Sequence, residues 1–319
     1  SRDGLLSLQV NGKTDASTGG DLKTQALTAH LPLLLHAAAS EPAARVLVIG
    51  LGSGITAAAA LTHPVGSLHV VEISPEVVEA ARLFEEANRG ALRDPRTTLL
   101  IRDARAHLLF GDGGPHTAPG GAPPYDVIAS QPSNPWVAGQ AILFTQEFFS
   151  LARERLAPGG LMCQWLQGQG LAPEDFRSIV ATFASVYTNV SLWEESTSGG
   201  DYLLVGSDRP FAIDALRLAG AMARPEVAAD LARIEVISPA DLLTHFVAGD
   251  DEIDRFARDA IVQTEDRLAL EFTAPAAIHR ETLGAILRIL EPIRTDPARL
   301  AGIGTSLATD LSRRARIAR

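Results

Sequence analysis

The chain has 319 residues, of which 46% are hydrophobic, and it carries a formal net charge of −10 at pH 7. This length is sufficient for one large domain or two with a well-formed core. The acidic balance excludes a typical nucleic-acid binder, which needs a basic face to neutralise phosphates. The single cysteine, Cys163, lies in an apolar run and cannot form an intrachain disulfide, so we interpret it as a buried thiol.

The N-terminal part predicts a hairpin followed by a helix. Residues 5–17 alternate loosely between apolar and polar side chains and contain Asn11-Gly12, which is typical of two-residue hairpin turns. Residues 21–36 place four leucines on one side of a predicted helix. No stretch reaches 18 uninterrupted apolar residues, so no membrane span is predicted, and no signal peptide is visible. Because the chain does not begin with methionine, we expect it to come from a longer protein.

Residues 45–72, RVLVIGLGSGITAAAALTHPVGSLHVVE, carry the strongest pattern. An apolar run breaks into Gly50, Gly52 and Gly54, an alanine-rich segment follows, and a second apolar run ends on Glu72. This order predicts a strand, a tight turn, a helix and a second strand. Glycines let the backbone approach a ligand, the helix start presents free N–H groups, and an acid about 20 residues further on can bind a ribose diol. The segment therefore predicts a nucleoside-binding βαβ unit.

Strands and helices continue to alternate after this unit. Ser74-Pro75-Glu76 is typical of a helix start, with a hydroxyl cap, a proline in the first turn and an acid at the positive end. The further predicted elements are strands at 97–101, 126–130, 160–166, 189–193 and 202–205, helices at 145–156 and 173–186, and a Gly/Pro-rich loop at 111–124. The last two strands are expected to form an antiparallel pair. The alternation predicts an α/β fold with a mostly parallel sheet covered on both faces.

Beyond about residue 208 the pattern predicts helices only, as an appended region. We therefore predict three parts: an N-terminal β-hairpin region over residues 1–30, a Rossmann-like nucleoside-binding domain over 31–208, and a C-terminal helical region over 209–319. In an open parallel sheet, ligands bind outside the carboxyl ends of the strands. The glycine turn, Glu72, Asp103 and the tract QPSNPW (131–136) each follow a predicted strand, so we expect the site there. Structural roles remain as alternatives, because both acids could cap helices and the prolines could only shape a loop.

Eight segments in a fixed order carry a further pattern: LQVNGKTDAST (8–18), Gln25 before HLPLLLH (30–36), VLVIGLGSG (46–54), VVEISPEVVEAAR (70–82), RDAR (102–105), YDVIASQPSNPW (125–136), LFTQEFF (143–149) and TEDRLALEFTAP (264–275). They resemble the spermidine synthases, or polyamine aminopropyltransferases, and more closely the bacterial spermidine-synthase-like domains fused to membrane-spanning segments. The resemblance implies a class I S-adenosylmethionine-binding Rossmann-like domain behind a small hairpin domain. It also implies a cytoplasmic homodimer and a membrane-spanning segment in a longer parent chain.

The resemblance assigns roles to individual residues. Family members bind decarboxylated S-adenosylmethionine, transfer its aminopropyl group to an amine such as a polyamine, and release methylthioadenosine. By position, Glu72 would hold the ribose hydroxyls, Asp103 with Ala104 the adenine, and Gln25 would lie near the sulfur. The expected nucleoside-binding residues are Gln25, Gly50, Gly52, Ser53, Gly54, Glu72, Ile73, Asp103 and Ala104.

The departures from the family pattern concern its carboxylates. Two aspartates that usually follow the fourth strand are replaced by Gln131 and Asn134, and an aspartate of the glycine turn is replaced by Ser53. An alkylammonium acceptor with a pKa of about 10 needs a base before it can attack, and an amide cannot serve. Without the aspartate at position 53, the carboxylate of intact S-adenosylmethionine would meet less repulsion. Gln131, Asn134 and Asp21 are the catalytic candidates, with Asp21, Asp201 or a histidine as a substitute base.

These observations predict an enzyme that binds S-adenosylmethionine or its decarboxylated form and cleaves the sulfur–alkyl bond. Methylthioadenosine would leave through aminopropyl transfer to an amine, or through intramolecular cyclisation or elimination. Two alternatives remain open: a non-catalytic nucleoside-binding regulatory domain, and a methyltransferase on the same scaffold. No metal is expected, because His30 and His36 have poor spacing for a shared site. Trp165 could line the substrate mouth or the core, and residues 264–267 could close over the site or pack against the Rossmann-like domain.

Overall fold

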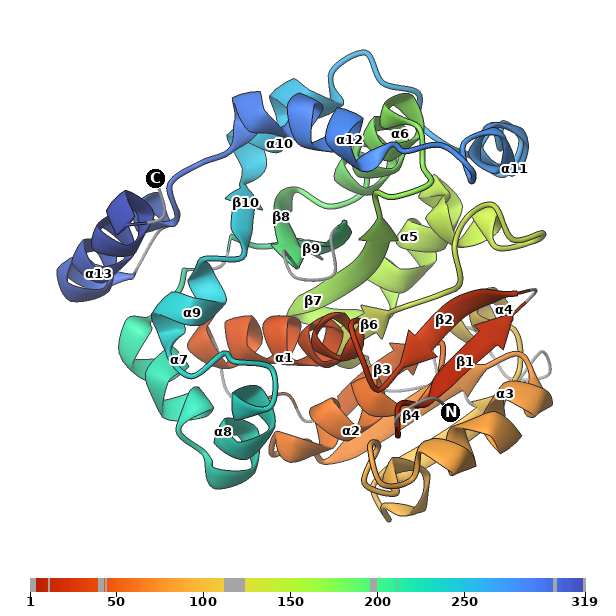
Figure 1. Ribbon diagram of the computed structural model, residues 1–319, viewed down its shortest axis with the longest axis horizontal. Helices are drawn as coiled ribbons and strands as arrows, with labels where there is room; N and C mark the ends of the chain where they lie inside the picture. The colour runs from red at the N-terminus through yellow and green to blue at the C-terminus, as the bar shows by residue number, and fades with distance from the viewer. Residues whose placement is uncertain are drawn as a thin grey trace.

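The computed structural model describes residues 4–10, 12–39, 43, 45–111, 124–195, 200–210, 212–300 and 303–317. Within them, an eight-stranded sheet lies at the centre in the spatial order β10-β8-β9-β7-β6-β3-β4-β5, with helices on both faces (Figure 1). The strands are β3 (Arg45–Ile49), β4 (Ser67–Glu72), β5 (Thr97–Ile101), β6 (Tyr125–Ser130), β7 (Leu156–Gln167), β8 (Asn189–Glu195), β9 (Asp201–Ser207) and β10 (Phe246–Ala248).

The pairing of the strands confirms the predicted Rossmann-like sheet. Strands β5, β4, β3, β6 and β7 are parallel neighbours, and β8 and β9 form the predicted antiparallel pair beside β7. Strand β7 starts earlier than residue 160, because Leu156 already pairs with Tyr125 before residues 157–160 interrupt the register. Strand β10 was not predicted: it lies in the region expected to contain helices only and pairs antiparallel with β8.

Thirteen α-helices are described: α1 (Leu22–Ala39), α2 (Ile55–Thr62), α3 (Pro75–Ala81), α4 (Ala104–Phe110), α5 (Gln146–Glu154), α6 (Pro173–Ala184), α7 (Ala215–Met222), α8 (Pro225–Ala232), α9 (Pro239–Leu243), α10 (Asp250–Ala257), α11 (Leu270–Thr273), α12 (Leu283–Leu290) and α13 (Gly304–Ile317). In the described part of the chain, none of them has the length and apolar character that crossing a membrane requires. Helix α3 begins as predicted, since the Ser74 hydroxyl accepts a hydrogen bond from the Val77 N–H at 3.2 Å.

The hydrophobic core has two halves, one on each face of the sheet. Val46 and Val48 of β3 pack with α1, α2, α7 and α8, whereas Leu47 and Ile49 pack with α4, α5, α6 and α10. This division follows from the strand itself, in which successive side chains point to opposite faces. C-terminal helices contribute to both halves, with α7 against α1 and α10 against α6.

An antiparallel hairpin of β1 (Ser7–Val10) and β2 (Lys13–Ser17) precedes α1, as predicted, and forms a separate two-stranded sheet (Figure 1). Gly12 adopts a φ of 82° in its turn. Asn11, the other residue of the predicted turn, lies outside the described residues, as does most of the predicted loop at 111–124.

Residues 264–267, whose place the sequence left open, pack against the Rossmann-like domain. The Arg105 guanidinium on α4 donates two hydrogen bonds to the Glu265 carboxylate, at 2.6 and 2.7 Å. The Glu265 N–H in turn donates to the Glu147 carboxylate on α5 at 3.0 Å. These contacts hold the segment against α4 and α5.

A buried polar cluster joins α8 to the Rossmann-like domain. His30 Nε2 lies 3.0 Å from Asp230 Oδ2, and His30 Nδ1 lies 2.9 Å from His63 Nε2. Arg89 and Arg233 donate hydrogen bonds to the other oxygen of Asp230, at 2.6 and 2.7 Å. Burial alone would raise the pKa of Asp230, but the hydrogen bond and charge of His30 and the charge of Arg89 lower it to about 2. Burial lowers the pKa of His63 well below its usual value, and His30 and Arg224 lower it further.

We expect the folded protein to lose stability as the pH falls from 7 to 5. The unfolded chain binds a proton at His63 near the usual pKa of about 6.5, whereas the folded chain resists it, so protonation favours unfolding. One such proton changes the free energy of unfolding by at most about 1.4 kcal/mol per pH unit. Urea unfolding of the parent and of a His63→Gln variant across this range measures the effect. A pH slope that is equal in both would contradict the assignment to His63.

Candidate functional site

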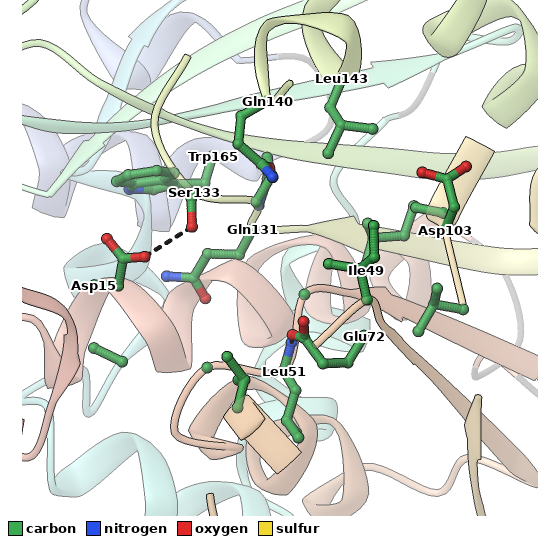
Figure 2. A pocket seen from close by; sticks show the side chains of 18 of the residues that line it. Asp15, Ile49, Leu51, Glu72, Asp103, Gln131, Ser133, Gln140, Leu143 and Trp165 are labelled. Atoms are coloured by element: carbon green, nitrogen blue, oxygen red, sulfur yellow. Dashed lines mark hydrogen bonds between the residues drawn. The ribbon is translucent and has the colours of Figure 1, made fainter. Parts of the chain in front are cut away.

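A pocket opens at the carboxyl ends of the parallel strands, where the sequence placed the site (Figure 2). Its wall contains Gly50 after β3, Glu72 at the end of β4, Asp103 after β5 and Gln131 after β6. Four loops from four strands therefore meet at one ligand-sized hollow. Eight of the predicted site residues line it: Gln25, Gly50, Gly52, Glu72, Ile73, Asp103, Ala104 and Gln131.

The glycine turn brings the backbone of β3 against the loop that follows β6. Gly50 has a φ of +87°, and a Cβ built on it would lie 2.4 Å from the Gln131 carbonyl oxygen. Gly54, at the start of α2, has a φ of +83°, and its Cβ would lie 3.0 Å from the Asn88 amide nitrogen. Both positions therefore need glycine for backbone geometry and close packing. Gly54 itself does not line the pocket.

Glu72 is held rigidly at the wall of the pocket. Its side chain is only 7% exposed. One carboxylate oxygen accepts a hydrogen bond from the Leu51 N–H at 3.0 Å and the other from the Ser74 N–H at 2.9 Å. A carboxylate has about four lone-pair positions, so Glu72 retains the capacity to accept two hydroxyl groups from a ligand.

Asp103 both caps a helix and lines the pocket, the two roles that its position in the sequence left open. It is the N-cap of α4, and its Oδ1 accepts a hydrogen bond from the Ala106 N–H at 2.7 Å. Its side chain also lies on the pocket wall beside Ala104. The structural and the binding interpretations of Asp103 are therefore compatible.

Hydroxyl groups at and after the glycine turn contact the amide side chains of Gln25 and Gln131. Ser53 is fully buried behind the wall, and its hydroxyl donates to Gln25 Oε1 at 2.5 Å. Gln25 in turn donates from Nε2 to the Ser17 carbonyl at 2.8 Å, which fixes its amide between α1 and the hairpin. The hydroxyl of Thr56 lies 2.7 Å from Gln131 Oε1. The amide side chains of the pocket are thus held in place by neighbouring hydroxyl groups.

Two of the three catalytic candidates do not reach the pocket wall. The Asp21 carboxylate accepts a hydrogen bond from the Ser17 hydroxyl at the junction of hairpin and helix. Asn134 is 1% exposed and donates from Nδ2 to Gln167 Oε1 at 3.1 Å. Its Oδ1 has no hydrogen-bond partner among the described residues. Only Gln131 of this set lies on the wall.

Asp201, considered as a substitute base, is buried behind the site. Its two carboxylate oxygens accept hydrogen bonds from Thr24 Oγ1 at 2.7 Å and from Trp165 Nε1 at 3.1 Å. Trp165 itself lines the pocket and, at 9% exposure, also belongs to the hydrophobic core, so both of its expected places are correct. Asp201 thereby fixes the indole ring in the wall.

The sequence did not indicate the hairpin's own contribution to the pocket. Asp15 on β2 lines it, and its Oδ2 accepts a hydrogen bond from the Ser133 hydroxyl at 2.7 Å (Figure 2). Asp15 lies inside the first segment of the family resemblance, and Ser133 lies inside the tract after β6. Their pairing across 118 residues could not be deduced from either segment alone.

Residues 22–193, more than half of the chain, match the family model described as "Spermine/spermidine synthase domain". The chain belongs to this family. The spermine/spermidine synthase match begins at α1, so the hairpin that carries Asp15 lies outside it. Helices α1 to α6 and strands β3 to β7 fall inside the matched range.

Curated relatives from this family share part of the chain. A spermidine synthase from Dictyostelium discoideum is 28% identical over 184 residues, which cover 57% of this chain and 60% of that protein. A polyamine aminopropyltransferase from Mycobacterium tuberculosis is 35% identical over 154 residues, which cover 48% of this chain and 28% of that protein. The chain therefore spans less than two thirds of the length of either relative.

Solved structures of spermidine synthases share the fold. One in complex with the transition-state analogue AdoDATO has a TM-score of 0.55 at 18% identity, covering 89% of this chain and 80% of that one. The spermidine synthase of Thermotoga maritima has a TM-score of 0.53 at 18% identity, covering 89% and 79%. At 18% identity, this similarity shows that the chain shares the fold of the spermidine synthases.

Proposed function

We propose that the pocket binds the adenosyl group of S-adenosylmethionine or of its decarboxylated form. The observation that carries this proposal is Glu72, fixed by two backbone N–H groups between the glycine turn and Asp103. A buried acid at the end of the second strand of such a sheet is the usual partner of ribose hydroxyls. The names of the curated relatives support the same class of ligand.

We further propose that the bound sulfonium is cleaved with release of methylthioadenosine. A nucleophile attacks the alkyl carbon next to sulfur, the carbon–sulfur bond breaks, and its electron pair stays on sulfur, which leaves as a neutral thioether. An amine nucleophile must lose a proton, and Gln131 cannot accept it. A carboxylate nucleophile within intact S-adenosylmethionine is already ionised, so cyclisation needs no such base. The amide at Gln131 therefore favours an intramolecular reaction over aminopropyl transfer to a polyamine.

A non-catalytic nucleoside-binding domain is the second candidate. The tract 131–134 carries no carboxylate, and Asn134 is buried away from the pocket. A nucleoside sensor needs Glu72 and Asp103 to bind its ligand but needs no catalytic base. This chain has an amide, Gln131, at the position where the family has an aspartate.

Product analysis separates these functions. The purified protein is incubated with S-adenosylmethionine or its decarboxylated form, each with and without putrescine, and the products are identified by mass spectrometry. Methylthioadenosine from S-adenosylmethionine alone would establish a cyclase or lyase, and methylthioadenosine from the decarboxylated form only with putrescine would establish an aminopropyltransferase. S-adenosylhomocysteine would indicate a methyltransferase, and binding without turnover would favour the sensor.

We expect Glu72→Gln to weaken the binding of methylthioadenosine by roughly 10- to 100-fold. The change removes the negative charge that strengthens hydrogen bonds from ribose hydroxyls, and a charge-assisted hydrogen bond contributes about 1.5 to 3 kcal/mol. Isothermal titration calorimetry measures the dissociation constant. Glu79→Gln, an equal loss of charge on the exposed face of α3, is the control and should bind as the parent does. Equal affinities of the Glu72 variant and the control would disprove the role of Glu72.

A further inference from the structure

We infer that a second cavity, between α2 and α8, binds a small molecule with an oxyanion group on a short aliphatic body. Figure 1 shows α8 beside α2, and the cavity opens between these helices and residues 88–96. Its volume is about 530 Å³, within the range of small-molecule sites. In the described part of the chain, it shares no lining residue with the nucleoside pocket. Helix α8 also lies beyond the residues that the family model matches, so this cavity is a separate site.

The floor of the cavity is apolar. Ala58 and Leu61 of α2 and Ala91 line it and are at most 7% exposed, and Ala229 adds an exposed methyl group from α8. No aromatic side chain lines the cavity within the described ranges. The floor therefore offers contact to a short alkyl group rather than a stacking surface for a flat ring.

Arg89 supplies a guanidinium group to the wall. Its side chain is 40% exposed, and Nη2 donates to Asp230 Oδ1 at 2.6 Å. Arg233 donates to the same oxygen at 2.7 Å, and His30 Nε2 lies 3.0 Å from the other oxygen. The single negative charge of Asp230 is thus shared between two guanidinium groups and cannot neutralise both. A guanidinium has five N–H groups, so Arg89 keeps donors for a ligand.

The remaining charged groups of the wall do not offset this positive charge. Arg96 makes two hydrogen bonds with the Asp94 carboxylate, at 2.9 and 2.8 Å, so this pair is neutral. Glu226, on the first turn of α8, is exposed, and water and salt screen its charge. The surplus charge lies at Arg89, and an oxyanion is the ligand group that matches the fork of a guanidinium.

The backbone holds Arg89 in place before a ligand binds. Arg89 and Gly90 have φ values of 51° and 64°, in the left-handed region that is uncommon for a non-glycine residue. The preceding Asn88 is 3% exposed and lines the cavity. Its Nδ2 donates to the Ser53 carbonyl at 2.8 Å, and its Oδ1 accepts from the Gly90 N–H at 3.0 Å. A turn that is fixed in this way loses less conformational freedom on binding.

The test uses probes that share one aliphatic body and differ in the head group. Hexanoate and hexyl phosphate carry an oxyanion, whereas hexylammonium carries a cation, and titrations followed by ligand-observed NMR measure their dissociation constants. We expect both anions to bind at least about fivefold more tightly than hexylammonium, and Arg89→Gln to weaken the anions by about fivefold or more, because it removes charge-assisted hydrogen bonds. Arg93→Gln is the control: this side chain is 69% exposed, pairs with Glu85 outside the cavity, and should leave the affinities unchanged.

A second pair of variants locates the site without changing a charge. Ala229→Trp places a large side chain over the cavity from an exposed position on α8 and should abolish the binding of hexanoate. Ala228→Trp, at the exposed neighbouring position that does not line the cavity, should bind as the parent does. Arg89→Gln is expected to fold, since Arg233 and His30 still contact Asp230. If circular dichroism shows that it does not, the two tryptophan variants decide the inference.

Losses that are confined to Arg89→Gln and Ala229→Trp support the inference. Equal affinities for hexanoate and hexylammonium, or equal losses in a variant and its control, would overturn it. Failure of the parent protein to bind either anion at millimolar concentrations would also overturn it. Hexanoate that is displaced by methylthioadenosine and unaffected by Ala229→Trp would lie in the nucleoside pocket, which overturns the inference and leaves the proposed function untouched.

Discussion

Replacement of Gly50 by alanine is expected to destabilise the fold by about 2 to 5 kcal/mol and to abolish ligand binding. The residue has a φ of +87°, and the new Cβ would lie 2.4 Å from the backbone carbonyl oxygen of Gln131. Neither atom belongs to a flexible side chain, so the strand ends of β3 and β6 must separate. Because both strands form the floor of the pocket, the change affects stability and binding together. Urea unfolding and calorimetric titration of methylthioadenosine measure the two effects.

Gly220→Ala is the matched control for this substitution. Gly220 lies within α7, and a Cβ built there meets no atom within 4 Å. Alanine is favoured over glycine in a helix interior by about 1 kcal/mol, so we expect this variant to be slightly more stable than the parent. If both variants lost stability to a similar degree, the argument from the close approach at Gly50 would be wrong.

Introduction of an aspartate at position 131 should increase amine-dependent release of methylthioadenosine by about 100-fold or more, the usual effect of a positioned general base. Gln131 lies on the pocket wall, and the Thr56 hydroxyl beside its Oε1 could equally donate to a carboxylate. The new base would accept the proton from an attacking amine. Initial rates with decarboxylated S-adenosylmethionine, with and without putrescine, measure the gain.

A second pocket residue provides the control for Gln131→Asp. Gln140 also lines the pocket, so Gln140→Glu adds the same charge away from the end of β6. An equal gain in both variants would show that charge alone attracts the amine, and no gain in either would show that position 131 does not set the chemistry. Asn134→Asp is a poor companion, because it would place a carboxylate at a site that is 1% exposed.

Parts of the site that depend on short-range signals could be predicted from the sequence. The run from Val46 to Glu72 contains its own strand, turn, helix and strand. Ligands of open parallel sheets bind at the carboxyl ends of the strands, so this run also predicts the position of the ligand. Ser74 capped its helix as expected, because a hydroxyl, a proline and an acid in consecutive positions act within one helical turn. Glu72 and Asp103 then reached one pocket because parallel strands end at the same edge of the sheet.

The position of Gln131 relative to the glycine turn follows from the same logic. Strand β6 pairs with β3, so the loop after it must meet the loop after β3. The sequence gives no such rule for Asn134, three residues further on, whose side chain turns inward toward Gln167. In an irregular loop, side chains a few residues apart can face either the ligand or the core, and the sequence has no periodic pattern that shows which.

The α/β class, the order of strands and helices along the chain and the acids at the strand ends could all be predicted from the sequence, since periodicity, turns and caps act over a few residues. The distant residues that complete the pocket are set by tertiary contacts and could not be predicted in this way. Asp15 meets Ser133, and Trp165 meets Asp201, through packing between elements that no local pattern connects. Strand β10 likewise joins the sheet only because the edge of β8 offers it unpaired backbone groups. Local signals specify elements, whereas contacts between distant elements specify the walls of a site.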